Sequence, residues 1–194
     1  MFKKVRIHYF TGTGNSLSAA TTLSSSLTKK GSSVTLINIE KEKNSPSGKS
    51  DLDIFVFPVL AYSVPHIVQT YMKSFAKRKD APKAAVLMTG GGWTGRANAQ
   101  ADRILARRGF DVIVSDFVSY PNNWSQMSPT PDAKESAKII KSAPKTITAF
   151  VSSLIKEKRS HFRVSPFNSL WTTVVGFSFL NIGRQFLGYG FTAD

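Results

Sequence analysis

Along the first four fifths of the chain, short apolar runs alternate with longer segments in which apolar residues recur at helical spacing. Five runs are bounded by Gly, Pro or polar clusters, which is the pattern of strands. They are Val5–Phe10, Ser33–Ile39, Leu52–Pro58, Ala84–Thr89 and Phe110–Val118. The third run is apolar at consecutive positions, which predicts a strand covered on both faces of a parallel sheet.

Between these runs, apolar residues recur at steps of three and four, which predicts helices. The predicted helices are about Ser16–Lys30, Pro65–Phe75, Ala97–Leu105 and Thr130–Lys158. We expect Thr130 to cap the last helix, with Pro131 in its first position, and Pro144 to kink or split it. Segment 40–50 carries charges, a Pro and a Gly, so we expect an irregular loop or a short helical turn there.

Five strand segments connected mostly by helices predict an α/β fold, since parallel neighbours need crossover connections. The expected architecture is three-layered, with helices on both faces of a doubly wound parallel sheet of five strands. Ligands bind such sheets at the carboxyl ends of the strands. We therefore expect the ligand-binding residues in the loops that follow the strands.

Composition narrows the possible chemistry. The chain of 194 residues has no cysteine, which excludes disulfides, thiolate zinc sites and iron–sulfur ligands within it. Its three histidines lie far apart and predict no metal site. The net charge of +14 is spread over both halves. We interpret it as a solvated basic surface without a specific nucleic-acid site, although nonspecific attraction to phosphates stays open.

The N-terminus leads directly into a strand pattern and has no apolar signal region, so we expect a cytoplasmic protein.

The most informative stretch is Thr11-Gly12-Thr13-Gly14-Asn15-Ser16, which joins the first strand to the first helix. Glycines let the backbone approach a ligand, and the hydroxyls and the first N–H groups of the helix point to the same place. The stretch therefore predicts a phosphate site. A Walker loop would need Lys after Gly14, and a dinucleotide fingerprint would need Gly where Leu17 stands. Both alternatives are excluded.

The remaining pattern, Thr-x-Thr-Gly-x-Ser, resembles the phosphate loop of flavodoxin-like FMN proteins. The resemblance covers about Lys3 to Lys158 and implies the strand order 2-1-3-4-5. It also implies that hydroxyls and backbone N–H groups hold the FMN phosphate without an obligatory cation. Because the dinucleotide glycine pattern is broken, we expect FMN rather than FAD or NAD.

The resemblance further implies that the loops after the third, fourth and fifth strands surround the flavin ring, with Tyr62 and Trp93 in the positions of ring-contacting side chains. Arg96 is the nearest basic group in sequence, and such charge would raise the flavin potential. The candidate cofactor-binding residues are Thr11, Gly12, Thr13, Gly14, Asn15, Ser16, Leu60, Ala61, Tyr62, Ser63, Thr89, Gly90, Gly91, Trp93, Asn122, Asn123 and Trp124. No catalytic residue is predicted, because the flavin itself carries the redox chemistry.

The remainder of the chain does not continue the strand–helix alternation, which predicts a flavin domain over 1–158 and an appendage over 159–194. Polar residues interrupt its uncharged stretch too often for a transmembrane helix. Apolar residues recur on one expected helical face, at Phe167, Leu170, Trp171, Val174, Phe177 and Leu180. Packing on the flavin domain, a homodimer interface, a partner domain or a membrane surface would each cover this face.

The stretches Ile7–Ser16, Phe57–Pro65 and Gly190–Asp194 are similar to fusion proteins in which a flavodoxin-like domain precedes a ferredoxin domain with two [4Fe–4S] clusters. The ferredoxin part is absent here. The resemblance implies an FMN-binding electron-transfer flavoprotein or oxidoreductase that exchanges electrons with a ferredoxin-type iron–sulfur partner. Two alternatives stay open: a flavin-free module that uses its basic surface, and a nicotinamide-dependent quinone or chelate reductase.

Overall fold

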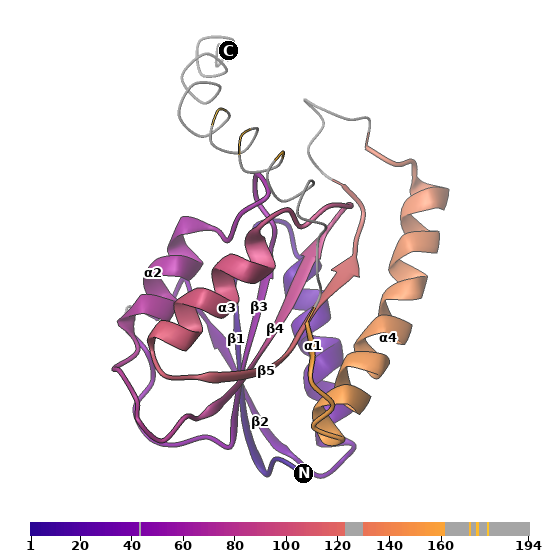
Figure 1. The fold of residues 1–194 in the computed structure, drawn as a ribbon. Coiled ribbons are helices and arrows are strands. Elements are labelled where there is room, and N and C mark those ends of the chain that lie inside the picture. Colours follow the sequence, from indigo (N-terminus) through magenta and orange to yellow (C-terminus); the bar gives the residue numbers. More distant parts are fainter. Residues whose placement is uncertain (43, 123–129, 162–170, 172–173, 175–177, 179–194) are drawn as a thin grey trace.

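The computed structural model describes residues 1–42, 44–122 and 130–161, together with residues 171, 174 and 178. A parallel sheet lies between two layers of helices (Figure 1). The strands are β1 (Lys4–Tyr9), β2 (Ser33–Asn38), β3 (Leu52–Pro58), β4 (Lys83–Gly90), β5 (Asp111–Ser119) and β6 (Ser160–His161). The helices are α1 (Asn15–Thr28), α2 (His66–Ser74), α3 (Ala97–Arg107) and α4 (Ala133–Ile155).

The strand order is β2-β1-β3-β4-β5-β6, with every neighbouring pair parallel. The predicted α/β class and the order of the first five strands are confirmed, but the prediction of five strands is wrong, because Ser160–His161 adds a sixth beside β5. This short strand has no hydrophobic pattern that the sequence could reveal. Side chains attach it instead: Arg159 binds Asp111 through two contacts of 2.7 and 2.8 Å, and His161 Nδ1 lies 3.1 Å from Asp102 Oδ2.

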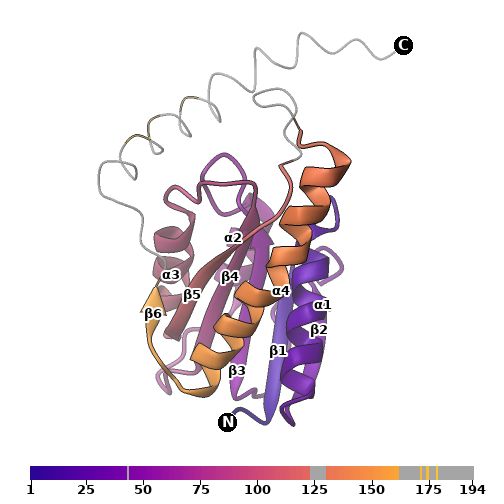
Figure 2. The same ribbon diagram turned by 90° about the vertical axis from the view of Figure 1, so that its right-hand side faces the viewer.

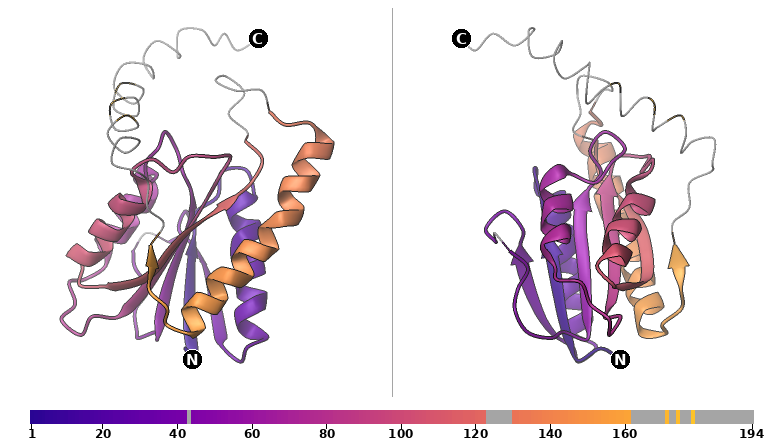
Figure 3. Two further views of the ribbon diagram at one scale, coloured as in Figure 1. Left: turned by 45° about the vertical axis from the view of Figure 1, so that its right-hand side comes forward. Right: turned by 60° about the vertical axis from the view of Figure 1, so that its left-hand side comes forward.

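Two apolar clusters cover the two faces of the sheet. One is formed by α1 and α4 with side chains such as Ile7, Ile54 and Val114. The other is formed by α2 and α3 with side chains such as Phe55 and Val86. Figure 2 shows α1 and α4 together on one side, and Figure 3 shows the opposite side with α2 and α3. Consecutive residues of β3 alternate between the clusters, which is why its run is continuously apolar.

Helix α4 differs from the prediction in two details. It runs through Pro144 as one helix, and it begins one residue after Asp132 rather than at Pro131. Pro144 lies on the exposed side, where water can bind the carbonyl that loses its partner, while Ala143 and Ile147 hold the opposite side in the core. The cap is Asp132, whose Oδ1 accepts the Glu135 N–H at 2.7 Å, and not Thr130.

Among the described residues of segment 39–51, no helix connects β2 to β3, which agrees with the expected irregular loop. The helices that the structure describes include none long and apolar enough to cross a membrane, and no described group of His, Asp or Glu could hold a metal ion. Most of 159–194 lies outside the described residues, so the predicted appendage stays a prediction. Two of its apolar residues, Trp171 and Val174, are described and are exposed.

Candidate functional site

The loop between β1 and α1 has the conformation that its glycines allow. Gly14 has a φ of +94°, which a residue with a side chain rarely adopts, and it directly precedes the first helical residue. Its N–H donates to Thr11 Oγ1 at 3.0 Å, and its carbonyl accepts the Ser18 N–H at 2.9 Å. The loop therefore turns back on itself and presents the N-terminus of α1 to the carboxyl edge of the sheet.

The next N–H groups of this helix are open. Among the described residues, no acceptor is found for the N–H groups of Asn15, Ser16 and Leu17. A Cβ placed at Gly12 would meet no atom within 4 Å, so space remains in front of the loop. Unpaired N–H groups at the positive end of a helix form an anion site. The loop has the donors and the room for a phosphate.

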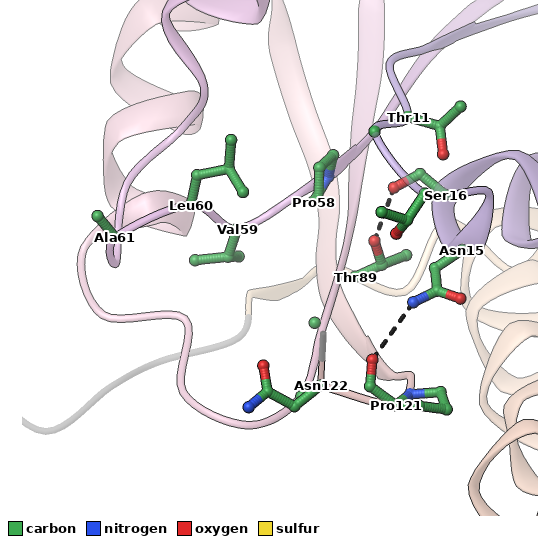
Figure 4. A pocket seen from close by; sticks show the side chains of 14 residues that line it. Thr11, Asn15, Ser16, Pro58, Val59, Leu60, Ala61, Thr89, Pro121 and Asn122 are labelled. Carbon is green, nitrogen blue, oxygen red and sulfur yellow. Dashed lines mark hydrogen bonds between the residues drawn. The ribbon is translucent and has the colours of Figure 1, made fainter. Parts of the chain in front are cut away.

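A cavity of about 590 Å³ opens beside this loop, a size common for small-molecule and cofactor sites. Loops from the carboxyl ends of β1, β3, β4 and β5 converge on it (Figure 4). Its lining consists of Thr11, Gly12, Thr13, Asn15, Ser16, Pro58, Val59, Leu60, Ala61, Thr89, Gly90, Gly91, Pro121 and Asn122. None of these residues carries a charge. Hydroxyls and backbone groups lie on the β1 side, and an apolar wall lies on the β3 side.

Two hydrogen bonds connect the start of α1 to the neighbouring loops (Figure 4). Ser16 Oγ and Thr89 Oγ1 are 2.7 Å apart, and both residues are buried. Asn15 Nδ2 donates to the Pro121 carbonyl at 3.4 Å. The phosphate loop is thus tied to β4 and to the loop after β5, so that the cavity walls are held in place without a ligand.

The loop after β3 forms a tight turn beside the cavity. The backbones of Leu60 and Ser63 exchange two hydrogen bonds, of 2.9 and 3.1 Å. Between them, Ala61 and Tyr62 have φ angles of +45° and +60°. Left-handed residues with side chains cost about 1 to 3 kcal/mol each, and strain of this kind concentrates at binding sites. The turn is retained by outside contacts, since the Arg96 N–H donates to the Tyr62 carbonyl at 3.2 Å.

The structure brings most of the predicted site residues together. From the phosphate loop, five of the six line the cavity; Gly14 shapes the turn behind it. Leu60, Ala61, Thr89, Gly90, Gly91 and Asn122 also line it. Tyr62, Ser63 and Trp93 do not, and Trp93 is 64% exposed. Asn123 and Trp124 lie outside the described residues.

Sequence reasoning missed three lining residues, Pro58, Val59 and Pro121. Pro58 ends the third predicted strand and Val59 follows it, while Pro121 lies in the loop after the fifth predicted strand. Apolar residues immediately after two strands of a parallel sheet were the available signal. Arg96 does not line the cavity; its Nε lies 3.3 Å from Ser63 Oγ.

No family model matches the sequence, and no curated protein matches it. Solved structures do match. A flavone reductase aligns with a TM-score of 0.56 at 12% identity, covering 85% of this chain and 69% of the reductase. The Flv1 flavodiiron core from Synechocystis sp. PCC6803 aligns with a TM-score of 0.53 at 23% identity, covering 80% of this chain and 37% of that core. Megasphaera elsdenii flavodoxin aligns with a TM-score of 0.49 at 17% identity, covering 73% of this chain and 98% of the flavodoxin.

With its strand order and the two alignments above a TM-score of 0.5, the chain has a flavodoxin-like fold. At these identities the likeness concerns the fold alone, and the chain spans little more than a third of the flavodiiron core. The residues that line the cavity determine which ligands it can bind.

Proposed function

We propose that this chain binds FMN in the cavity at the carboxyl edge of the sheet and acts as an electron-transfer flavoprotein or oxidoreductase. The observation that carries the proposal is the loop Thr11–Ser16, with open N–H groups beside a cavity that has one polar and one apolar side. In a phosphate ester joined to a flat aromatic ring, the phosphate needs the polar side and the ring needs the apolar side. The names of the structural neighbours, which include flavodoxins and a flavone reductase, support the proposal.

Each wall has a separate task. The hydroxyls of Thr11 and Thr13 and the first N–H groups of α1 would hold the phosphate, so that no cation is required. Pro58, Val59 and Leu60 offer an apolar surface to the ring, and Gly90 and Gly91 permit close approach of the backbone. FMN, when bound, accepts and passes on one or two electrons. The protein contributes orientation, partial exclusion of water and an uncharged surrounding.

The uncharged lining bears on the redox potential. A carboxylate beside the flavin would disfavour a reduced anionic ring, and a cation would favour it. The cavity lining has neither, because every lining side chain is neutral. We therefore propose that backbone contacts, rather than a charged side chain in the lining, set the potential.

The first test compares FMN with riboflavin, which lacks the phosphate. Full-length protein should quench FMN fluorescence on titration and bind riboflavin at least tenfold more weakly, since a charge-assisted phosphate contact contributes about 1.5 to 3 kcal/mol. The double variant Thr13→Ala, Ser16→Ala should weaken FMN strongly and reduce its advantage over riboflavin. Thr22→Ala, in the same helix but away from the cavity, is the matched control. Unchanged FMN affinity in a folded double variant would refute the assignment.

The electron partner is a further proposal. We propose a ferredoxin-type iron–sulfur protein or domain, on the resemblance of Gly190–Asp194 to the stretch that precedes the first cluster in fusion proteins. Mixing reduced ferredoxin with the FMN-loaded chain under anaerobic conditions should bleach the visible absorption of the flavin. Bleaching by a reduced nicotinamide cofactor alone, which transfers a hydride to the flavin, would instead favour the reductase alternative.

A further inference from the structure

A second hollow lies between the C-terminal ends of α2 and α3. It has a volume of about 280 Å³ and is lined by Lys73, Lys77, Ile104, Arg107 and Arg108. The two helices lie side by side on the same face of the sheet (Figure 3). Both start near the carboxyl edge and return to the amino edge, so this hollow and the candidate FMN cavity lie at opposite edges of the sheet. It is a separate site.

The four cations of this hollow lack a partner of opposite charge. None of Lys73, Lys77, Arg107 and Arg108 forms an ion pair with any residue that the structure describes. The nearest acidic residues in sequence are Asp80 and Asp111, and Arg78 binds Asp80 through contacts of 2.9 and 2.6 Å. At the same edge of the sheet, Lys83 pairs with Glu157 and Arg159 with Asp111. The hollow therefore keeps an uncompensated positive charge, whereas the nearby cations Arg78, Lys83 and Arg159 are paired.

Helix stability explains only part of this cluster. Cations in the last turn of a helix interact favourably with its dipole, and Lys73 and Arg107 occupy such positions. Arg108 follows the last helical residue of α3, and Lys77 lies three residues beyond the end of α2. The dipole effect fades beyond the last turn. The helix dipole therefore does not explain why Lys77 lies beside the other three cations.

The floor of the hollow is rigid. Ile104 is 8% exposed, and the Arg78 N–H donates to the Arg108 carbonyl at 2.9 Å. At Gly109, which has a φ of +84°, a Cβ would lie 1.9 Å from the Arg78 carbonyl oxygen. The segment after α2 and the end of α3 thus touch through their backbones, in a contact that only glycine permits. The four cations extend from a framework that exists before a ligand arrives.

We propose that this hollow binds the diphosphate group of a small molecule. Two arginines offer planar forks that bind phosphate oxygens in pairs, and two lysines add point charges. Two linked phosphates carry more negative charge and span a wider set of oxygens than one phosphate, so they match four cations better. A nucleic-acid duplex offers its phosphates along an extended surface, whereas these cations surround one compact hollow. The diphosphate can belong to a nucleotide or be free, and the experiment separates these sources.

The test is a calorimetric titration of the full chain with inorganic pyrophosphate at about 50 mM salt. We expect one equivalent to bind at this hollow, in addition to any that the phosphate loop binds, and the double variant Lys73→Gln, Arg107→Gln to bind that equivalent at least tenfold more weakly. Lys29→Gln, Lys30→Gln, at the end of α1, is the matched control with the same loss of charge and should bind as the unmodified chain does. Lys77→Gln, outside both helices, should weaken binding at least threefold without affecting helix stability.

Further arms identify the ligand and the place of binding. ADP that binds as tightly as pyrophosphate, with AMP at least fivefold weaker, supports a diphosphate within a nucleotide; binding of pyrophosphate alone supports the free anion. The variant Thr13→Ala, Ser16→Ala should bind pyrophosphate unchanged, which separates this site from the phosphate loop even if FMN does not bind there. Absence of pyrophosphate binding, an equal loss in both charge variants, loss in the phosphate-loop variant, or tighter binding of a DNA duplex would each overturn the proposal.

Discussion

Strand β1 carries a closed polar cluster, and three residues later the chain carries an open one. His8 is fully buried; its Nδ1 lies 2.9 Å from the Tyr71 hydroxyl and its Nε2 lies 3.0 Å from Asp53 Oδ1. Asp53 is also bound by Arg6, at 2.6 and 3.1 Å, and by Ser50, at 2.9 Å. In the loop Thr11–Ser16, by contrast, N–H groups face a cavity.

The protonation states of the closed cluster follow from burial and hydrogen bonding. Burial lowers the pKa of His8 more than the contact with Asp53 raises it, so the ring is neutral. Burial alone would raise the pKa of Asp53, but hydrogen bonds from His8 and Arg6 hold it at about 2. Burial also raises the pKa of Tyr71, so its hydroxyl stays a donor to His8 Nδ1.

Strand β1 contributes to stability through the closed cluster and leads directly into the loop that offers a binding site. In the closed cluster every principal polar group has a partner within the chain, so the cluster connects β1, β3 and α2 and leaves little for a ligand. In the open loop the helix N–H groups lack such partners, so a bound ligand would supply the missing hydrogen-bond acceptors. Buried polar groups are costly when a partner is removed, whereas exposed ones can exchange a ligand for water.

The largest effect is expected from opening the closed cluster. Asp53→Ala leaves Arg6 and His8 without their acceptor in a buried position, and should lower the free energy of unfolding by about 3 to 5 kcal/mol, as for other broken buried pairs. Urea denaturation measures the change. Asp80→Ala is the control, because its ion pair is exposed and should matter little. A similar small loss in both variants would show that the cluster does not stabilise the fold.

Acid should weaken the closed cluster before it affects the loop. Unfolded His8 takes up a proton near its ordinary pKa of 6.5, while folded His8 does so only at lower pH. Stability should therefore fall as pH drops below 6.5, by up to about 1.4 kcal/mol per unit from this residue. Asp53 adds a second loss between about pH 4 and 2, where it becomes protonated in the unfolded chain before the folded one.

Urea denaturation at several pH values measures this slope. His8→Gln should flatten it between pH 6.5 and 5, and His66→Gln, at an exposed position, should leave it unchanged. Equal slopes in His8→Gln and the unmodified chain would contradict a buried neutral His8.

Loosening the open loop should affect binding rather than stability. Thr11→Ala removes the acceptor of the Gly14 N–H and lets the loop relax. We expect FMN affinity to fall about tenfold, equivalent to about 1.4 kcal/mol, with little change in unfolding. Thr28→Ala, at the other end of α1, is the control. A loss of stability without a loss of affinity would reverse the roles of the two clusters.

The smallest effect on stability is expected at Trp93. Its side chain is 64% exposed, so Trp93→Ala should change the free energy of unfolding by less than about 0.5 kcal/mol. The prediction that Trp93 and Tyr62 contact the ring is separate. If they do, Trp93→Ala or Tyr62→Ala will increase the fluorescence of bound flavin. Unchanged fluorescence in both variants would make these residues part of loop packing only.

Local sequence patterns are sufficient to predict the parallel sheet and the position of its ligand edge. Continuous apolar runs such as Leu52–Pro58 require cover on both faces, and Gly14 followed by a helix start specifies a turn with open N–H groups. These features are local, since each depends on residues close together in the chain. For the same reason the loop Thr11–Ser16 can be recognised in the sequence, whereas the other loops that line the cavity cannot be recognised as clearly.

Contacts between groups that are distant in the sequence depend on the packing of the whole fold. No sequence pattern connects His8 to its partners Asp53 and Tyr71, because they are 45 and 63 residues away. The strand Ser160–His161 forms by backbone pairing with β5, and it is further held by contacts of Arg159 with Asp111 and of His161 with Asp102. The hollow of Lys73, Lys77, Arg107 and Arg108 likewise needs two helices packed side by side. Sequence patterns encode periodicity and local geometry, whereas such pairings depend on how the elements pack.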